Sequence, residues 1–361
     1  MRRVSALLAL LAITGVAATA APAAKRPETP SSAASVWDPQ EIATVVDSGL
    51  LGPSVDDYRP DDPLTWGELA DALAVWGHPI APPADPARPV TIRDLDARLV
   101  AALGLLPASR SVRVAARDAG LNPITSLGTE TVARLVGLRL NHPATQDQLE
   151  LLPAQPATRA EAAYSFAHAM AVSDWQKQQV LNETAALTFP DLTDWQRIVL
   201  TRALLFVGYP YVWTGTSEHV RQTLWDGTVV PGGFDCSGFV WRVYKLQPFP
   251  DAPELTQTLQ GRTTYAMSGE VPTELRVPIE ALEPADVVFF GSRGLLSKPA
   301  EIGHMGIYVG SGWFVHSSGH GVTLDPVTGW YETRFAWARS PLAEAGLDRP
   351  GTAAPPTVPV S

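Results

Sequence analysis

The stretch FDCSGFVWRVYKL, residues 234–246, decides how the C-terminal half of the chain folds. Asp235 is a good helix N-cap, and the apolar residues after it recur at helical spacing, so we predict a helix that starts at Cys236. Backbone N–H groups and the helix dipole at that end favour a thiolate and can stabilise an oxyanion. Cys236 is the only cysteine in the sequence. Its position indicates a nucleophile, whereas an inert core cysteine is expected mid-helix on the apolar face.

A second segment, HMGIYVGSGWFVH (residues 304–316), predicts a β-hairpin, because two apolar, β-rich runs flank Gly310-Ser311-Gly312. His304 and His316 then lie opposite each other or one diagonal step apart on the same face. One imidazole can fix the tautomer and orientation of the other. We therefore predict that Cys236 is the nucleophile, His304 its base and His316 the residue that orients the base.

A metal site is an alternative use of these side chains, with His320 or His219 as a further ligand. The sequence has no C-x-x-C or H-E-x-x-H motif, and Cys236 stands alone. We therefore predict neither a metal nor a cofactor.

The C-terminal region predicts an α+β domain over residues 190–341. A helix is expected over residues 194–206, and Cys236 starts a second one. Short strand-like runs follow over residues 286–290, 304–309, 313–317 and 334–339. Helices first and antiparallel strands after them indicate helices packed on an antiparallel sheet.

Five segments of this region, in order along the chain, resemble the NlpC-type cell-wall cysteine peptidases, which have a papain-like fold. The resemblance implies that Cys236 is the nucleophile, His304 the general base and His316 the third polar residue. The matching segments are YPYVWTG (209–215), FDCSGFV (234–240), EPADVVFF (283–290), HMGIYVG (304–310) and FVHSS (314–318).

The same resemblance implies the substrate side of the site. It places Tyr211 near the thiolate, and Asp235 and Ser237 where relatives contact the free amine of a stem peptide. Trp213 flanks the predicted cleft and is a further candidate for contacting substrate. The implied reaction is hydrolysis of an amide in peptidoglycan stem peptides, with the D-glutamyl–diaminopimelate bond favoured. An inactive wall-binding protein, and an acyl transferase or amidase on the same fold, are the alternatives.

The sequence departs from this family's pattern at several points. The two glycines expected after the tryptophan of YPYVWTG are Thr214-Gly215 here, and the glycine expected before the aspartate of EPADVVFF is Ala285. Residues 261–271 lack the customary Ser/Gln pattern. An insertion over residues 218–231 precedes the nucleophile and could reshape the cleft. The catalytic trio is retained, so we expect activity, but substrate specificity does not transfer.

The N-terminal region, residues 37–182, predicts a helical repeat domain. A helix, a Gly or Pro loop, a Pro-x-Thr step and a second helix recur along it. The first and third units resemble S-layer homology repeats through Trp37, through YRP at 58–60 and through TRAE at 158–161.

This second resemblance implies binding of cell-wall polysaccharide through Arg159. Trp66 holds the matching place in the first unit, and the second unit lacks the motif. Thr158 and Glu161 fit a plain helix-capping box equally well.

The two ends of the chain read as processing and linker segments. Two arginines, an apolar run and small residues predict a cleaved export signal over residues 1–23. Pro/Ala-rich composition predicts a flexible spacer over 24–36 and a disordered tail over 342–361. We therefore expect a secreted, extracellular or wall-associated protein without stable membrane insertion. The 37 acidic residues exceed the 27 Lys and Arg residues, and no basic block occurs, which disfavours nucleic acid as a partner.

Overall fold

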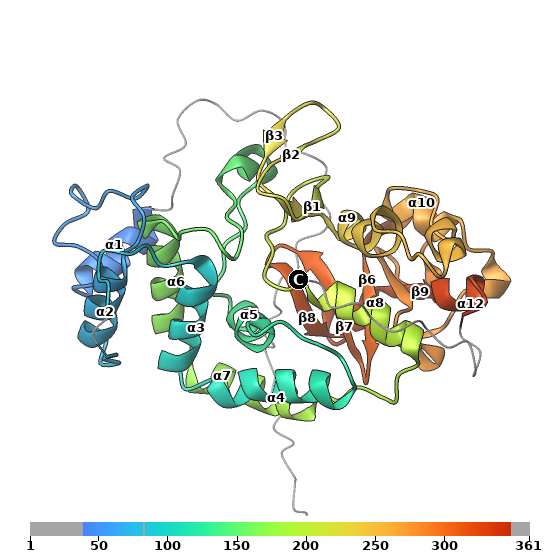
Figure 1. Ribbon diagram of the computed structural model, residues 1–361, viewed down its shortest axis with the longest axis horizontal. Helices are drawn as coiled ribbons and strands as arrows, with labels where there is room; N and C mark the ends of the chain where they lie inside the picture. Colours follow the sequence, from blue (N-terminus) through green and yellow to red (C-terminus); the bar gives the residue numbers. More distant parts are fainter. Residues whose placement is uncertain (1–38, 82–83, 348–361) are drawn as a thin grey trace, which may run out of the picture.

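The computed structural model describes residues 39–81 and 84–347. It has the α+β architecture that the sequence predicts (Figure 1). Helices form the N-terminal part, and an antiparallel sheet with helices packed on it forms the C-terminal part. The predicted signal peptide (1–23) and spacer (24–36) lie outside the described residues, so both stay predictions.

Small polar side chains start the helices of the N-terminal part. The hydroxyls of Thr65, Thr91 and Thr158 each accept a hydrogen bond from a backbone N–H in the first turn of the helix that follows. The helices are α1 (Pro39–Asp47), α2 (Trp66–Val75), α3 (Ile92–Ala102), α4 (Leu106–Asp118), α5 (Leu127–Leu135), the 3₁₀ helix η1 (Ala144–Leu149), α6 (Arg159–Ala171) and α7 (Asp174–Ala186).

The three Pro-x-Thr steps of the predicted repeats meet at one place. The backbone N–H of Leu64 donates to the carbonyl of Ala157, that of Val90 to Leu64, and that of Ala157 to Val90, each at 2.8 Å. Each step therefore donates to one neighbour and accepts from the other, which closes a ring of hydrogen bonds. This ring satisfies the backbone of three segments that lie far apart in the sequence and joins the helix pairs that follow them.

The C-terminal part is built on a five-stranded antiparallel sheet in the order β8-β7-β6-β5-β9. Its strands are β5 (Val287–Gly291), β6 (Ile302–Gly310), β7 (Trp313–Ser318), β8 (Gly321–Pro326) and β9 (Phe335–Arg339). Two short ribbons precede the sheet. In one, β1 (Thr216–Ser217) pairs with β4 (Gly233–Phe234), and in the other, β2 (Gln222–Thr223) pairs with β3 (Val229–Val230).

Short helices complete this part and surround the sheet. They are α8 (Asp194–Leu204), α9 (Cys236–Trp241), α10 (Thr264–Gly269), α11 (Trp330–Arg334) and α12 (Pro341–Glu344). A π turn over Arg242–Leu246 extends α9, and 3₁₀ turns cover Pro253–Gln257, Thr273–Leu275, Ile279–Ala281, Gly294–Leu296 and Pro299–Glu301.

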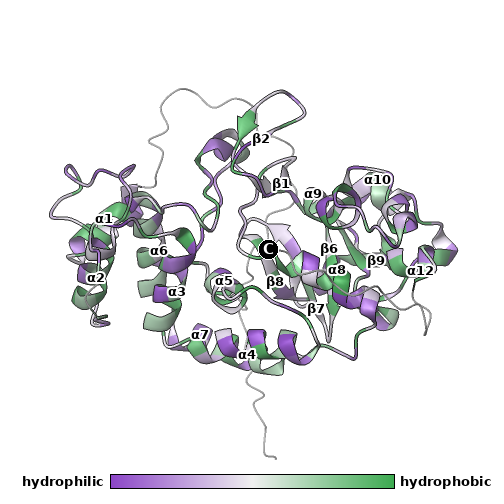
Figure 2. Ribbon diagram, in the orientation of Figure 1, coloured by the Kyte–Doolittle hydropathy of each residue, from purple (hydrophilic) through white to green (hydrophobic). Residues whose placement is uncertain are grey.

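Two large hydrophobic cores organise the described residues. One lies among the N-terminal helices, and the other lies between the sheet and helices α8 and α9. Figure 2 shows the hydrophobic character of β6 and β7 and the mixed character of α4. The second core also takes in Val112 and Ala116 of α4 and Leu127 of α5. The N-terminal part thus completes the core under the sheet, and the domain boundary near residues 182–190 stays a prediction.

The end of the chain differs from the predicted disordered tail (342–361). Leu342 and Leu347 are buried in the second core, and Arg339 forms an ion pair with Glu344 at 2.5 Å. Two buried leucines and this ion pair explain why α12 forms here. Residues 348–361 lie outside the described part of the chain.

Membrane-spanning character is weak among the described residues. None of their single helices has the length and apolar character of a span, and only α3 with α4, across a bend of 118°, meets both criteria when the two are joined.

Candidate active site

Cys236 is the first residue of α9, as the sequence predicts. The Asp235 carboxylate caps the helix by accepting a hydrogen bond from the Gly238 N–H. Gly238 must be glycine, because a Cβ here would lie 1.9 Å from the Gly215 carbonyl oxygen. The helix therefore packs tightly against the preceding loop, and Cys236 is only 4% exposed.

The expected thiolate does not form in this resting structure. Burial, with a smaller contribution from the Asp235 carboxylate, raises the pKa of Cys236 to about 12. The backbone N–H groups of Ser237 and Met305 act in the opposite direction. The α9 helix is only six residues long, so its N-terminal field is outweighed by desolvation.

The strand that carries His304 lies against this thiol, because the backbone N–H of the next residue, Met305, interacts with the Cys236 sulfur. The pKa of His304 is held well below its ordinary value, first by complete burial and then by the neighbouring His316. The thiol of Cys236 and the imidazole of His304 are therefore both neutral. This arrangement suits a general base that takes the thiol proton as the sulfur attacks.

A chain of hydrogen bonds fixes the tautomer of His304, the candidate base. His304 Nε2 and His316 Nδ1 are 2.9 Å apart, and His316 Nε2 is 3.0 Å from the Asp325 carboxylate. A carboxylate only accepts, so His316 carries its proton on Nε2 and accepts on Nδ1 from the Nε2–H of His304. The lone pair of His304 is then on Nδ1, the ring nitrogen that remains for the thiol.

Cross-strand register brings the two imidazoles together. Tyr308 pairs with Phe314 and Ile307 with Val315, so His304 and His316 lie one diagonal step apart on one face of the β6–β7 hairpin. His316 is fully buried.

Residues 208–339 match the NlpC/P60 family. This match confirms the resemblance predicted for the C-terminal region, whereas the S-layer homology resemblance of the N-terminal region stays a prediction.

Curated relatives match the chain over the same region. The probable endopeptidase Rv2190c of Mycobacterium tuberculosis is 35% identical over 126 residues, which cover 35% of this chain and 24% of that protein. The probable peptidoglycan endopeptidase LytE of Bacillus subtilis is 31% identical over 133 residues, 37% of this chain and 30% of LytE. The gamma-D-glutamyl-L-lysine dipeptidyl-peptidase of Bacillus subtilis is 26% identical over 133 residues, 36% of this chain and 34% of that protein. The chain therefore covers between 24% and 34% of the length of these relatives.

The substrate-side residues of the NlpC/P60 domain gather around an arginine that sequence reasoning missed. Arg262 donates to the Ser237 hydroxyl at 2.7 Å, to both carboxylate oxygens of Asp235 at 3.3 Å, and to the Thr214 carbonyl at 3.0 Å. It lies in the GRTTYAMSGEV stretch (261–271), which departs from the family's pattern. The guanidinium offsets the Asp235 charge beside the nucleophile.

Tyr211 also lies near the candidate nucleophile. Burial raises its pKa well above the ordinary value, and the Asp235 carboxylate, together with Cys236 when it ionises, adds to the rise. The phenol therefore lies close to both groups. Trp213 is half-buried two residues later and lines a small pocket with Trp225 of the insertion.

Two departures from the family pattern fall at positions of unusual backbone conformation. Thr214 has a φ of +60° and Ala285 a φ of +75°, and both replace expected glycines. The left-handed region favours glycine, and a β-branched threonine is the more strained of the two. The bond from Arg262 to the Thr214 carbonyl helps to hold that conformation.

The β8 strand is the element that sequence reasoning missed at the site. It carries Asp325, whose carboxylate ends the hydrogen-bonded chain that begins at His304. The GVTLDP stretch alternates apolar and polar residues, which is the signal that could have revealed it.

Arg159 lies in the N-terminal part, away from this site, and is 5% exposed. Its guanidinium donates to the carbonyls of Tyr58 and Leu51 and to the Glu68 carboxylate. These contacts join the first and third repeat units, so the side chain is engaged inside the fold.

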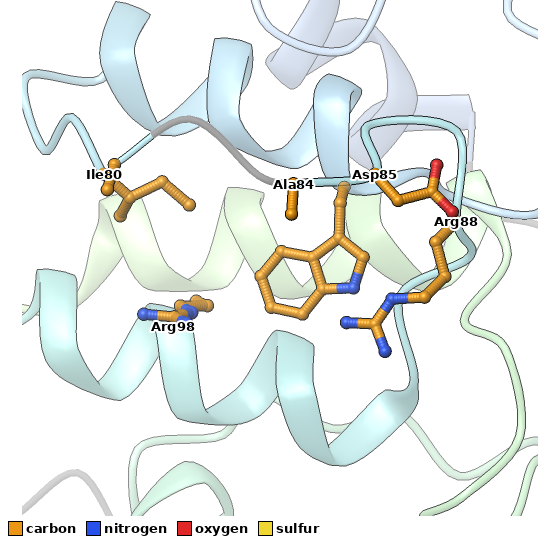
Figure 3. Close-up of a pocket in the computed structure, with 7 residues that line it drawn as sticks. Ile80, Ala84, Asp85, Arg88 and Arg98 are labelled. Atoms are coloured by element: carbon orange, nitrogen blue, oxygen red, sulfur yellow. The ribbon is translucent and has the colours of Figure 1, made fainter.

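A pocket of about 380 Å³ lies nearby at Trp66, the residue that matches Arg159 in the first unit. The guanidinium carbons of Arg88 and Arg98 are 5.4 and 5.3 Å from the centre of the Trp66 ring. Figure 3 shows both arginines and Asp85 around the indole.

Over residues 39–81 and 84–347, no three His, Cys, Asp or Glu side chains form a group suited to a metal ion. The imidazoles of the candidate site bond to each other and to Asp325 instead.

Proposed function

We propose that the protein is a peptidoglycan hydrolase, a cysteine endopeptidase that cleaves an amide bond in wall stem peptides. The observation that carries the proposal is the chain from Asp325 through His316 to His304 beside the buried thiol of Cys236. The names of two relatives, an endopeptidase and a peptidoglycan endopeptidase, support the class of substrate.

The proposed reaction has two steps. The Cys236 sulfur attacks the amide carbonyl carbon as its proton moves to His304 Nδ1, and His304 then gives that proton to the leaving amine as the C–N bond breaks. A water molecule next attacks the resulting thioester and passes a proton to His304. The product leaves as a carboxylic acid, which releases its proton to solvent, while His304 returns its proton to the sulfur. These two steps need no oxidant, metal or cofactor. The Cys236 backbone N–H is the proposed oxyanion donor.

We favour the D-glutamyl–diaminopimelate bond as the target. One relative is named for a gamma-D-glutamyl-L-lysine bond, which has the same acyl side. The guanidinium of Arg262 already occupies Asp235 and Ser237, so a free substrate amine would have to share these two residues with it. This observation favours a substrate whose N-terminal side is still attached to the wall.

The test is digestion of purified peptidoglycan by the full mature chain, with the soluble fragments identified by mass spectrometry. We expect fragments from the wild type and none from Cys236→Ala, and their masses name the bond. Products joined to an added amine indicate acyl transfer instead. If neither protein releases fragments while both bind sacculi, the inactive wall-binding alternative replaces the proposal.

We also propose that the protein is secreted and that its S-layer homology-like repeats bind wall polysaccharide. The pocket at Trp66 supports binding, because an aromatic ring flanked by two guanidinium groups suits an anionic sugar. Arg159, the residue implied by the resemblance, is less accessible to a polysaccharide than this pocket, because its guanidinium bonds to groups inside the fold.

Sedimentation with sacculi tests the polysaccharide proposal. Arg98→Ala should lower the bound fraction severalfold, whereas Arg110→Ala, at another exposed arginine of the same region, should not. Equal binding by both variants contradicts a role for the pocket.

A further inference from the structure

The backbone that leads into the candidate site is held by side chains from the N-terminal part. Asn141 Oδ1 accepts a hydrogen bond from the Tyr211 N–H at 3.2 Å, and the Asp147 carboxylate accepts one from the Trp213 N–H at 3.2 Å. Arg134 donates to the Gly208 carbonyl at 2.5 Å. In Figure 1, η1, which carries Asp147, lies beside the β2–β3 ribbon.

The other edge of this backbone pairs with the strand that precedes the nucleophile. Phe234 donates to the Pro210 carbonyl at 3.1 Å and accepts from the Val212 N–H at 3.3 Å. Alternate N–H groups therefore point to opposite sides. That of Val212 bonds to Phe234, two residues before Cys236, and those of Tyr211 and Trp213 bond to the N-terminal part.

Asn141 also reaches the histidine side of the site. Its Nδ2 donates to the Ser318 carbonyl at 2.9 Å, at the end of the strand that carries His316. One amide group thus links the segment of Tyr211 to β7. A side chain that makes both bonds fixes the separation of these two walls.

We infer that Asn141 and Asp147 are positioning residues of the candidate active site, which act by holding Tyr211 and Trp213 at the correct distance from Cys236. The N-terminal part then supports catalysis by positioning these residues, in addition to any role in wall binding. This inference rests on the proposed hydrolase function. Asn141 itself touches no reacting atom and acts through Tyr211.

A double-mutant cycle on the full chain tests the inference. We expect Asn141→Ala and Tyr211→Phe each to lower kcat/KM on soluble muropeptides about tenfold, mainly through kcat. If Asn141 acts through the Tyr211 hydroxyl, the double variant should be no more than about threefold below Tyr211→Phe. The matched control is Asn182→Ala, an exposed asparagine of α7 that bonds only within its own helix, and it should leave kcat/KM unchanged.

Two kinetic results overturn the inference. One is an Asn141→Ala variant within twofold of wild type. The other is a double variant whose loss of kcat/KM is the product of the two single losses. A purely structural role of Asn141 would lower kcat/KM by the same factor with Tyr211 or with phenylalanine at that position.

Hydrogen exchange separates failure of this inference from failure of the proposed function. Asn141→Ala should speed exchange in the peptide that contains the Tyr211 amide at least tenfold, whether or not the wild type hydrolyses peptidoglycan. If Asn141→Ala exchanges at the wild-type rate, Asn141 does not hold the Tyr211 backbone, even if the wild type is active. If exchange is fast in Asn141→Ala but the wild type is inactive, Asn141 does hold the Tyr211 backbone and the proposed hydrolase function is wrong.

A second pair of variants applies if Asn141→Ala fails to fold. Asp147→Asn keeps an oxygen that can accept from the Trp213 N–H and should stay within threefold of wild type, whereas Asp147→Ala should lose about tenfold. Equal activity of these two variants overturns the inference.

Discussion

At the scale of single residues, the resting state of the candidate nucleophile is set by burial. Cys236 has a pKa of about 12, and the pKa of His304 lies well below its ordinary value. Both groups are therefore uncharged at neutral pH, and the proton moves only during attack. This differs from the thiolate that the position of Cys236 at a helix N-terminus favours.

We predict a pH profile that follows from these two shifts. His304 must be neutral to act as a base, so kcat/KM should be flat above about pH 6.5, the ordinary pKa of histidine, and should fall only at lower pH. Alkylation of Cys236 by iodoacetamide should rise about tenfold per pH unit between about pH 7 and 10, because the thiolate is a minor form. An alkylation rate that is already constant below pH 7 contradicts the neutral pair.

The Asp325 carboxylate gives a second residue-scale prediction. Asp325→Asn can donate to His316 Nε2 through its amide, which reverses the tautomers of both histidines and puts a proton on His304 Nδ1. We expect kcat to fall about 10- to 100-fold with KM nearly unchanged, because the base is lost in part of the molecules. Asp251→Asn, at an exposed aspartate of the same domain, is the control. Unchanged kcat in Asp325→Asn shows that His316 is oriented without the carboxylate.

Some residues of this site can be predicted from the sequence, and others cannot. Cys236, His304 and His316 stand in local patterns, a capped helix and a hairpin, so their neighbourhood can be inferred from spacing. Asp325 and Arg262 lie outside these local patterns, and only the folded chain brings them to the site. Asp325 lies on a strand whose pairing with β7 is fixed by register, and Arg262 reaches Asp235 from a loop 27 residues away.

At the scale of elements, the hairpin and the helix after Cys236 follow from the sequence, but β8 does not. The GVTLDP stretch begins after a Gly/Ser loop and ends in Asp-Pro, both of which are typical of turns. Its four buried residues, Gly321–Leu324, pair with β7. Tertiary pairing therefore decides the conformation of a segment in which a short strand-like alternation is flanked by turn residues on both sides.

The insertion over residues 218–231 is an element whose effect we predict. It forms the β2–β3 ribbon, and Trp225 beside it is 78% exposed and lines a pocket of about 50 Å³ with Trp213 and residues of η1. Trp225→Ala should raise KM about three- to tenfold with little change in kcat, because it removes an exposed contact surface for substrate. Trp175→Ala, at a 70% exposed tryptophan of α7, is the matched control. An unchanged KM in Trp225→Ala means that Trp225 of the ribbon plays no part in substrate binding.

At the scale of the whole molecule, the sequence predicts two parts but not how they share a core. The Pro-x-Thr steps are visible as repeats, yet their closed ring of hydrogen bonds joins segments that only the folded chain brings together. Likewise, α4 and α5 have apolar positions at helical spacing, and nothing local says which core those positions enter. Val112, Ala116 and Leu127 belong to the hydrophobic core that contains the buried sheet residues, across the boundary that composition indicates.

This shared core leads to a prediction about stability. The full chain should unfold in one cooperative transition, because the buried Val112, Ala116 and Leu127 contribute to the same core as the sheet. A fragment of residues 190–347 lacks these side chains and leaves their apolar partners exposed, so its melting temperature should be lower by about 10 °C or more. Scanning calorimetry of both proteins measures this difference.

Leu127→Ala in the full chain should lower the melting temperature of its single transition, whereas Val114→Ala, at an exposed position of α4, should not. Two separate transitions in the wild type, with the fragment melting at one of them, mean that the parts fold independently and that contacts across the boundary add little to stability.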